Sequence, residues 1–359
     1  MGDGPAAARV AAWAGEQATI VTEAPPGPVC VMGAGAVGCY LGGSLQAVGV
    51  PVTYVGRPRV LDELRVHGLR LTDLDGGDRA LPASALTLAT SVPADVRFAL
   101  VLLCVKSGAT AEAVASLAAV LAPDTPVVSM QNGVSTADVA RAAAPNLRVL
   151  AGMVPFNVAR LGAGHFHRGT TGVLAAQDDP ALHRWTAVFK NAGLGLELHP
   201  DLRAIQWAKL LLNLNNPVNA LSGLPLRRQL LDRRYRACLA ALQQEALETL
   251  RAAHIAPARL TPVPAGWLPA LLRLPTPLFR LLAARMLRID EKARSSMADD
   301  VALGRTTEID ALCGEVVRMA RRQGLGAPLN DRMASLVQRR PERGAAYSGE
   351  ELERALGLR

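Results

Sequence analysis

Short apolar runs alternate with longer amphipathic stretches from Val29 to about His199. A strand that is buried on both faces of a parallel sheet reads as a continuous apolar run, and the stretches between these runs have the periodicity of crossover helices. The alternation therefore predicts a doubly wound α/β sheet with right-handed crossovers. The expected strands are Val29–Met32, Val52–Val55, Leu100–Val105, Val127–Met130, Val149–Val154, Gly172–Ala175 and Leu194–Leu198. The expected helices are Val37–Val48, Pro58–His67, Ala109–Leu121, Thr136–Ala143 and Pro180–Ala192.

The hydrophobic pattern changes after His199. Asp201 is suited to cap a helix that begins near Leu202, and helical periodicity then continues almost to Arg340 without a comparable apolar run. Glycine and proline predict breaks at Gly223–Pro225, Ala256–Pro257, Thr261–Gly266, Pro275–Pro277 and Gly324–Pro328. We expect four parts: a disordered tail over 1–27, a Rossmann-type domain over 28–199, an all-α domain over 200–340 and a polar C-terminal tail over 341–359.

Charge and composition exclude several classes of protein. The chain of 359 residues is long enough for two domains, and its net charge is +8. The arginines are scattered and do not alternate with aromatic residues, which argues against a nucleic-acid partner. The longest apolar stretch, Trp267–Leu287, contains three prolines and three arginines. Such a stretch predicts a soluble amphipathic helical segment rather than a membrane span.

Cysteine and histidine usage indicates a cytoplasmic protein without a metal site. Five cysteines are spread along the chain with no C-x-x-C pair, as expected for reduced thiols. His165 and His167 share one expected strand, but no further ligand lies near them in sequence. Residues 1–27 lack the basic start and continuous apolar core of a signal peptide.

A glycine-rich loop directly follows the first expected strand. It has the pattern G-x-G-x-x-G and consists of Gly33, Ala34, Gly35, Ala36, Val37 and Gly38. In such loops the first glycine permits a tight turn, the second lets a pyrophosphate approach the backbone, and the third lets helix and strand pack closely. The N–H groups and the positive dipole end of the next helix then point toward the phosphate. The loop predicts a dinucleotide cofactor.

Polar residues at three strand ends refine this prediction. Arg57 follows the second strand, and no acidic residue occurs before Asp62. An arginine can bind a 2′-phosphate that a carboxylate would repel, so NADP(H) is favoured over NAD(H). Lys106 follows the strand Leu100–Val105, and Asn132 follows the next strand. Because ligands of such sheets lie outside the carboxyl ends of the strands, both are candidates to contact the cofactor.

The helical half contains a second set of candidates. Lys209, Asn213 and Asn216 are spaced four and three residues apart, so they share one helix face among leucines. Buried amines and amides need hydrogen-bond partners or a ligand. Ser296 precedes Glu308 by twelve residues, about three helical turns. The two side chains would face one cleft if that helix is continuous.

Taken in this order, the motifs resemble the ketopantoate reductase (2-dehydropantoate 2-reductase) family over roughly residues 28–340. The matching pieces are the glycine loop with Arg57, Val105-Lys106-Ser107, Gln131-Asn132-Gly133, Trp207-Ala208-Lys209 with Asn213, Asn216-Pro217, and Ser296 followed by Thr307-Glu308-Ile309-Asp310. The resemblance implies a Rossmann-type domain followed by a helical domain like the C-terminal domain of 6-phosphogluconate dehydrogenase. It also implies NADPH-dependent reduction of 2-dehydropantoate to (R)-pantoate, a step toward pantothenate and coenzyme A, by a monomer or homodimer.

The resemblance also assigns roles to individual residues. Lys209 matches the general acid that protonates the carbonyl oxygen, and Glu308 matches a glutamate that holds the substrate hydroxyl and supports the lysine. Lys106 and Asn132 match residues that contact the cofactor and the reacting end of the substrate. The residues implied to bind the oxo acid are Asn213, Asn216 and Ser296.

Three departures from the family pattern leave the substrate open. Asn216 lies one residue closer to Lys209 than the family spacing, so either Asn215 or Asn216 is the binding residue. A further asparagine expected some ten residues later is not evident in Gly223–Arg227, and the segment 256–289 is longer and more apolar than usual. The alternatives are a reductase of another branched 2-oxo acid, an opine or 6-phosphogluconate type dehydrogenase, and a non-catalytic NADP(H)-sensing protein.

Overall fold

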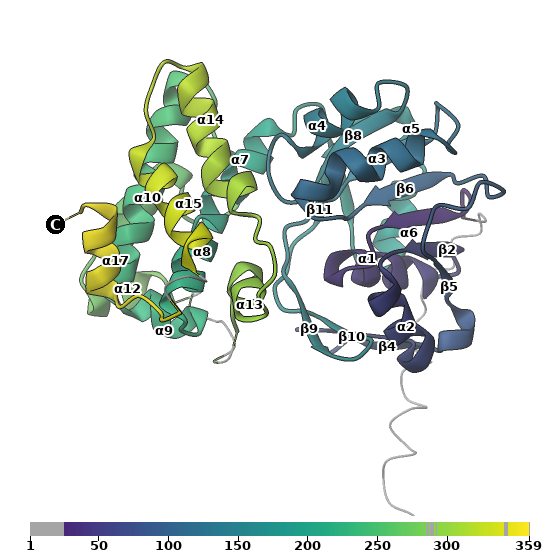
Figure 1. Cartoon of the computed structure of the whole chain (residues 1–359), viewed down its shortest axis with the longest axis horizontal. Coiled ribbons are helices and arrows are strands. Elements are labelled where there is room, and N and C mark those ends of the chain that lie inside the picture. The colour runs from purple at the N-terminus through teal and green to yellow at the C-terminus, as the bar shows by residue number, and fades with distance from the viewer. Residues whose placement is uncertain (1–24, 285–286, 288–290, 292, 341–343, 359) are drawn as a thin grey trace, which may run out of the picture.

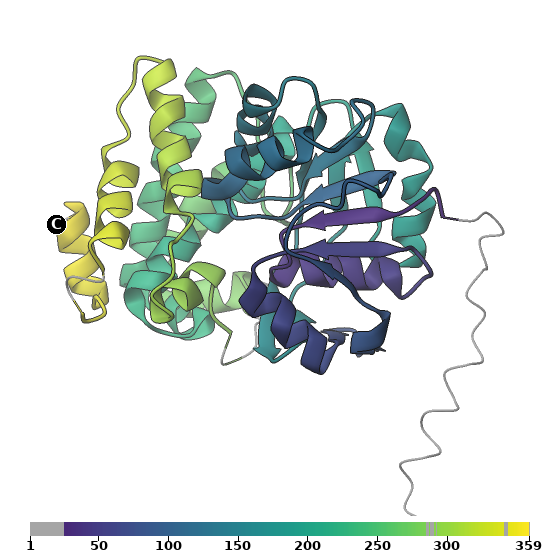
Figure 2. The ribbon, with the colours of Figure 1, turned by 45° about the vertical axis from the view of Figure 1, so that its right-hand side comes forward.

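The chain folds into an α/β lobe and a helical lobe that lie side by side (Figures 1 and 2). The computed structural model describes residues 25–284, 287, 291, 293–340 and 344–358. Most of the tail expected over 1–27 therefore lies outside the described residues. The last strand ends at His199 and the first helix of the helical lobe begins at Arg203. We propose residue 200 as the border between the two domains.

The main sheet of the α/β lobe has eight strands in the order β12-β11-β8-β7-β6-β1-β2-β5. Its strands are β1 (Val29–Met32), β2 (Val52–Val55), β5 (Thr87–Ala89), β6 (Leu100–Leu103), β7 (Pro126–Ser129), β8 (Arg148–Met153), β11 (Leu174–Gln177) and β12 (Leu196–His199). All neighbouring strands are parallel except β8 and β11. The strand order reverses between β1 and β6, and doubly wound sheets bind ligands at the carboxyl ends of the strands beside such a point.

Helices cover both faces of the main sheet, which confirms the doubly wound α/β prediction. Val29 and Val31 of β1 belong to one apolar cluster and Cys30 to another, because successive side chains of a strand point to opposite faces. The helices on the Val31 side include α1 (Ala36–Gln46) and α6 (Trp185–Asn191), and those on the Cys30 side are α3 (Thr110–Ala118) and α4 (Thr136–Ala143). The other helices of this lobe are α2 (Pro58–His67) and α5 (Pro180–His183).

The α/β lobe contains a second, four-stranded sheet, of which the sequence predicted only the strand that carries His165 and His167. Its order is β4-β3-β10-β9, and its strands are β3 (Leu69–Asp73), β4 (Asp78–Leu81), β9 (Val158–Gly162) and β10 (His165–Arg168). These strands are short and half exposed, so they lack the continuous apolar runs of the main sheet. His165 and His167 of β10 both hydrogen-bond the Thr72 hydroxyl, at 2.9 and 2.8 Å.

The helical lobe contains one large apolar core built around the long helix α10 (Arg233–Ala252). Its other α-helices are α7 (Arg203–Asn213), α8 (Asn215–Ser222), α9 (Leu226–Leu231), α11 (Leu268–Arg273), α12 (Thr276–Leu282), α13 (Ser296–Ala302), α14 (Glu315–Arg322), α15 (Pro328–Gln338) and α17 (Gly349–Leu356). The Asp201 carboxylate accepts the Arg203 N–H, so it supports the start of α7 one residue later than expected. Among the described residues, no helix has both the length and the apolar character needed to cross a bilayer.

Two helices that the sequence suggested as continuous are interrupted. The stretch containing Lys209 breaks at Leu214, because Pro217 lacks the N–H that would bond the Asn213 carbonyl. The stretch from Ser296 to Glu308 ends at Ala302, and Gly304 then adopts a φ of +61°. The predicted glycine and proline breaks fall between helices or at their starts, but Ala256–Pro257 and Thr261–Gly266 share the one connection between α10 and α11. Gly223 ends α8 in a left-handed conformation.

The segment 341–359, expected to be no more than a polar tail, contains the helix α17 (Gly349–Leu356). Ser348 and Glu351 form a reciprocal capping box at the start of α17. Leu352 and Leu356 are fully buried in the core of the helical lobe. The segment reads as polar because only this narrow apolar stripe faces the core.

Candidate functional site

The glycine loop between β1 and α1 has the geometry of a dinucleotide cradle. Gly33 has a φ of +116°, and a Cβ at this position would lie 2.6 Å from the Val105 nitrogen. A Cβ at Gly38 would lie 2.2 Å from the Gly33 carbonyl oxygen, so neither position accepts a side chain. A Cβ at Gly35, in contrast, would meet nothing within 4 Å. No side chain caps the start of α1, so the loop and helix fit a pyrophosphate approaching at Gly35.

Arg57 lies beside this loop at the carboxyl end of β2. The neighbouring Gly56 packs so closely on Ala34 that a Cβ would lie 2.7 Å from the alanine methyl group. Arg57 is the N-cap residue of α2 and is exposed. It has no ion pair or hydrogen bond from its guanidinium within the described part of the chain, which leaves all of its donors available to an anion.

A polar cluster joins the two lobes at the carboxyl ends of β6 and β7. Glu308, from the helical lobe, accepts the Ser107 N–H at 3.0 Å and the Asn132 side-chain amide at 3.1 Å. Lys106 forms an ion pair with Asp300 at 2.7 Å and donates to the Thr306 carbonyl at 2.8 Å. The structure thus brings together three of the residues selected from the sequence, and α13, which carries Asp300, lies between the lobes (Figure 1).

Gln131 fixes the relative position of the two strand ends. Its side-chain nitrogen donates to the Val105 carbonyl at 2.9 Å and to the Thr110 hydroxyl at 2.7 Å, while its oxygen accepts from Ser129 at 2.9 Å. The side chain is buried, so these bonds are shielded from water. Lys106 and Asn132 each directly follow a residue held in this network, which sets their spacing.

Lys209 reaches the same edge of the sheet from α7. Its Nζ donates to the carbonyl of Val154, which follows β8. Asn132 and Val154 each lie three residues beyond the paired residues Ser129 and Ala151 of the neighbouring strands β7 and β8. Burial lowers the pKa of Lys209 to about 8 because an ammonium ion is poorly solvated there.

The expected direct support of Lys209 by Glu308 is absent from the described residues. Glu308 makes its hydrogen bonds to Ser107 and Asn132 instead, and burial alone accounts for the pKa of Lys209. Glu308 also does not share a helix with Ser296. It lies in the segment after α13, just before the π-helical turn η5 (Asp310–Gly314). The continuous helix that would have placed Ser296 and Glu308 on one face, three turns apart, is therefore not present.

The expected substrate-binding residues differ in whether their side chains already have hydrogen-bond partners in the described chain. The side-chain amides of Asn213 and Asn216 are half-buried and make no hydrogen bond to the rest of the described chain. The Asn215 side chain accepts from Gln229 at 3.1 Å. Ser296 is exposed at the first residue of α13, whereas the preceding Ser295 is buried and caps that helix.

Two residues that the sequence did not single out complete the site. Asp300 lies four residues after Ser296, one helical turn further along α13, and that spacing was the available signal. Asn219 is fully buried, donating to the Leu224 carbonyl and accepting the Ser295 N–H, both at 2.9 Å. It therefore ties α8 to the start of α13. The described residues contain no group of three or more His, Cys, Asp or Glu side chains that could hold a metal ion.

A dinucleotide-type sheet, a helical lobe and a polar cluster between them define the class of two-domain oxidoreductases. Residues 29–179 match the family described as ketopantoate reductase PanE/ApbA, and residues 201–340 match its C-terminal domain. The chain belongs to the ketopantoate reductase family.

Relatives and solved structures agree with this membership. The chain is 27% identical to a 2-dehydropantoate 2-reductase of Halobacterium salinarum, over 86% of this chain and 97% of the relative. It is 26% identical to one of Pyrococcus horikoshii, over 86% and 96%. A ketopantoate reductase structure from Ralstonia eutropha JMP134 aligns with a TM-score of 0.74 and 30% identity, over 88% of this chain and 99% of that one. A D-mandelate dehydrogenase structure with NADH and anilino(oxo)acetate aligns with a TM-score of 0.73 at 18% identity, over 89% and 100%, which shows the fold alone.

Proposed function

We propose that the chain is an NADPH-dependent reductase of 2-oxo acids that converts 2-dehydropantoate to (R)-pantoate. The observation that carries the proposal is the Lys209 amine, which lies against the Val154 carbonyl at the sheet edge that also holds Asn132. Its pKa is lowered to about 8, so the amine can exchange a proton near neutral pH, as a general acid must. Membership of the family and the 2-dehydropantoate 2-reductases among its relatives support the choice of substrate.

In this proposal Lys209 acts on the carbonyl oxygen of the substrate. The Val154 carbonyl orients the amine, and burial makes its positive charge act in a poorly screened environment. The ammonium group stabilises the negative charge that develops on the oxygen and then donates a proton to it. The cofactor, when bound, supplies the hydride that adds to C2.

The remaining polar groups orient the two reactants. Glu308 holds the Asn132 amide in place, so that its remaining donor and acceptor are set for the reacting end of the substrate. Asn213, Asn216 and Ser296 bind the oxo acid. We assign this role to Asn216 rather than Asn215, because the Asn215 side chain is already bonded to Gln229.

The loop from Gly33 to Gly38 and Arg57 would hold the cofactor. The open space at Gly35 would admit the pyrophosphate, and the unpaired guanidinium of Arg57 would donate hydrogen bonds to the 2′-phosphate of NADP(H). Lys106 adds a positive charge at the neighbouring strand end, where it is already paired with Asp300.

Reduction of another 2-oxo acid is the second candidate function. The D-mandelate dehydrogenase of the same fold was solved with NADH and anilino(oxo)acetate, so this architecture accommodates an aromatic oxo acid in that protein. A non-catalytic NADP(H)-sensing protein is the third candidate, and a desolvated lysine at the sheet edge argues against it. An opine or 6-phosphogluconate type dehydrogenase is disfavoured by the set of Lys209, Asn213 and Glu308.

The cellular setting and assembly are also part of the proposal. All five cysteines are free, and four of them are buried, which suits a reducing compartment such as the cytoplasm. The partner is a small 2-oxo acid, and neither nucleic acid nor a membrane is expected. The chain acts as a monomer or a homodimer; a ketopantoate reductase of Staphylococcus aureus with the same fold is dimeric.

The test follows NADPH absorbance with 2-dehydropantoate and, in parallel, with a panel of aliphatic and aromatic 2-oxo acids. We expect 2-dehydropantoate to give the highest kcat/KM. A higher value for another oxo acid would change the assigned substrate but leave the proposed reaction, reduction of a 2-oxo acid by NADPH, in place. NADPH binding without turnover of any oxo acid would contradict the proposal and favour a non-catalytic NADP(H)-sensing protein.

A further inference from the structure

A cavity of about 630 Å³ opens at the opposite edge of the main sheet from the candidate site. Its lining comes from the segments that precede β6 and β7, from the first residues of β7 and β8, and from α5 and the residue that follows it. The same three strands lead to Lys106, Asn132 and Val154 at their other ends. A strand of four residues spans about 13 Å, so the cavity is separate from the glycine loop and from the polar cluster between the lobes.

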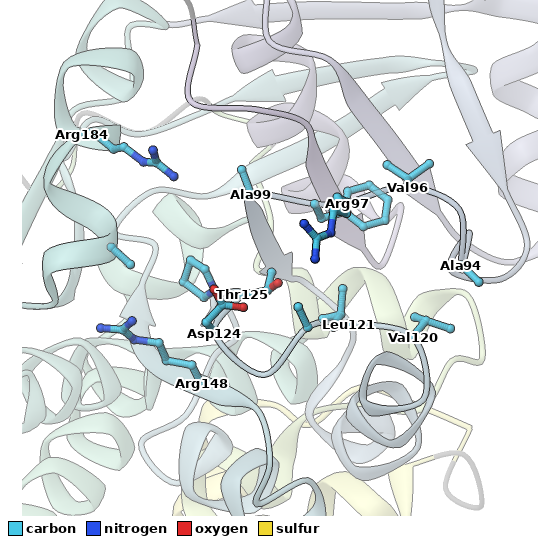
Figure 3. Close-up of a pocket in the computed structure, with 14 residues that line it drawn as sticks. Ala94, Val96, Arg97, Ala99, Val120, Leu121, Asp124, Thr125, Arg148 and Arg184 are labelled. Carbon is cyan, nitrogen blue, oxygen red and sulfur yellow. The ribbon is translucent and has the colours of Figure 1, made fainter.

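The charge of this cavity is mainly positive and only partly compensated. Its charged side chains are Arg97, Arg148, Arg184 and Asp124. Arg148 is engaged by Asp179 through two hydrogen bonds of 3.0 and 2.6 Å. Arg97 and Arg184 are exposed and have no ion pair or side-chain hydrogen bond within the described parts of the chain. Figure 3 shows Arg184 on one side of the cavity and Arg97 on the other, with Ala99 between them in this view and Asp124 and Thr125 below.

The rest of the lining adds an apolar wall and two oxygen groups. Val96, Phe98, Val120 and Leu121 contribute the apolar surface. Beside it, the Asp124 carboxylate can accept a hydrogen bond from a hydroxyl group, and the Thr125 hydroxyl can donate one. A simple inorganic anion would leave both the apolar wall and the Asp124 acceptor unused.

Unpaired arginines also line a second cavity, where Arg233 and Arg273 have no ion pair or side-chain hydrogen bond within the described residues, so it is the net charge that differs between the two cavities. A cavity of about 580 Å³ in the helical lobe is lined by Arg233, Arg234 and Arg273 together with Asp232 and Glu353. There Arg234 forms an ion pair with Glu350 at 2.8 Å, and two carboxylates share the lining with three arginines. The excess of positive charge is therefore greater in the cavity of the α/β lobe.

We propose that the cavity lined by Arg97 and Arg184 binds a small organic dianion that also carries a hydroxyl group. The two arginines bind the anionic oxygens through paired N–H donors, and Asp124 accepts the hydroxyl proton. Sugar phosphates and hydroxy dicarboxylates share this chemistry. The site does not depend on the reaction proposed for the opposite edge of the sheet.

The test is isothermal titration calorimetry with two probes, glycerol 3-phosphate and 3-hydroxyglutarate, on protein saturated with NADPH so that the glycine loop is not available to them. We expect one saturable site per chain for at least one probe. The double variant Arg97→Gln/Arg184→Gln should weaken binding at least about tenfold, because it removes two charge-assisted contacts. The matched double variant Arg233→Gln/Arg273→Gln removes the same charge from the other cavity and should bind as the unmodified chain does.

The outcomes identify which kind of dianion binds and which results would overturn the proposal. Tighter binding of glycerol 3-phosphate assigns the site to phosphate esters, and tighter binding of 3-hydroxyglutarate assigns it to dicarboxylates. Equal weakening in both double variants would show general attraction to a basic surface and overturn the proposal. Absence of saturable binding of either probe would overturn it as well. All substituted arginines are exposed, and an unchanged melting temperature would show that the variants are folded.

Discussion

At the scale of single residues, the lowered pKa of Lys209 makes a signed prediction about pH. A general acid must be protonated, and kcat/KM reports the pKa of the free enzyme. The value of kcat/KM should therefore be constant below pH 8 and fall as the pH rises through about 8. Lys209→Ala should lose about two to three orders of magnitude in turnover, the usual contribution of such groups.

The control for this prediction is Lys190→Ala, which removes an exposed lysine from α6. It should keep both the turnover and the pH profile of the unmodified chain. Near-normal turnover of Lys209→Ala, with its NADPH binding intact, would remove Lys209 from the mechanism.

Arg57 makes a prediction about the choice of cofactor. Its guanidinium is exposed beside the glycine loop and has no partner in the described chain, so removal of its charge should affect only the 2′-phosphate. We expect Arg57→Gln to raise the KM for NADPH at least about tenfold, the effect of one lost bidentate contact, and to leave the KM for NADH unchanged. Steady-state kinetics with both cofactors measures this. The exposed Arg59→Gln, on the same helix, is the control, and an equal change for NADPH and NADH would contradict the assignment.

At the scale of secondary-structure elements, Arg236 holds several helix ends together. It is fully buried in α10 and donates to the carbonyls of Leu230, Leu272 and Leu274, at 2.9, 3.0 and 2.9 Å. These carbonyls belong to the last turns of α9 and α11, where a helix leaves acceptors without partners. The guanidinium also stacks 4.3 Å from the centre of the Phe279 ring in α12.

The prediction concerns Arg236→Leu. Three buried carbonyls lose their donors, so the free energy of unfolding should fall by about 3 kcal/mol. Urea unfolding followed by circular dichroism measures the change. Arg233→Leu, at an exposed position of the same helix, should change the free energy by less than about 0.5 kcal/mol. Equal stability of the two variants would show that Arg236 does not join these helices.

The elements differ in how well the sequence predicts them, and burial explains the difference. β1, β2, α2 and α4 have the predicted bounds, because their apolar residues match a strand buried on both faces or one face of a helix. β3, β4 and β9 were missed, and β10 was expected only as a strand around His165 and His167, because these short strands are half exposed and lack a continuous apolar run. α17 was missed because its stripe of buried leucines is hidden among charged residues.

At the scale of the whole molecule, the candidate site was only partly predictable. Lys106 and Asn132 were found because a parallel sheet brings the ends of neighbouring strands together. Glu308 accepts hydrogen bonds from Ser107 and Asn132, which lie 201 and 176 positions earlier in the sequence. No local pattern specifies such a contact, and the same holds for the Lys106–Asp300 ion pair between the lobes. The roles of these residues stay predictions.

Binding of the cofactor to the native state should raise the stability of the molecule, and Gly35 isolates this effect. NADPH at about a hundred times its Kd adds about 2.7 kcal/mol, which raises the melting temperature of a chain of this length by roughly 3 to 4 °C. Gly35 has a φ of −85°, which alanine also adopts, and a Cβ there would meet nothing within 4 Å. Gly35→Ala should therefore have the melting temperature of the unmodified chain without cofactor. It should lose most of the increase in melting temperature that NADPH gives, because its methyl group takes the place of the pyrophosphate.

Gly162→Ala in β9 is the control: it also adds a methyl group in open space and should keep the full NADPH-dependent increase in melting temperature. Differential scanning calorimetry with and without NADPH measures both variants, and a full NADPH-dependent increase in Gly35→Ala would exclude the glycine loop as the cofactor site.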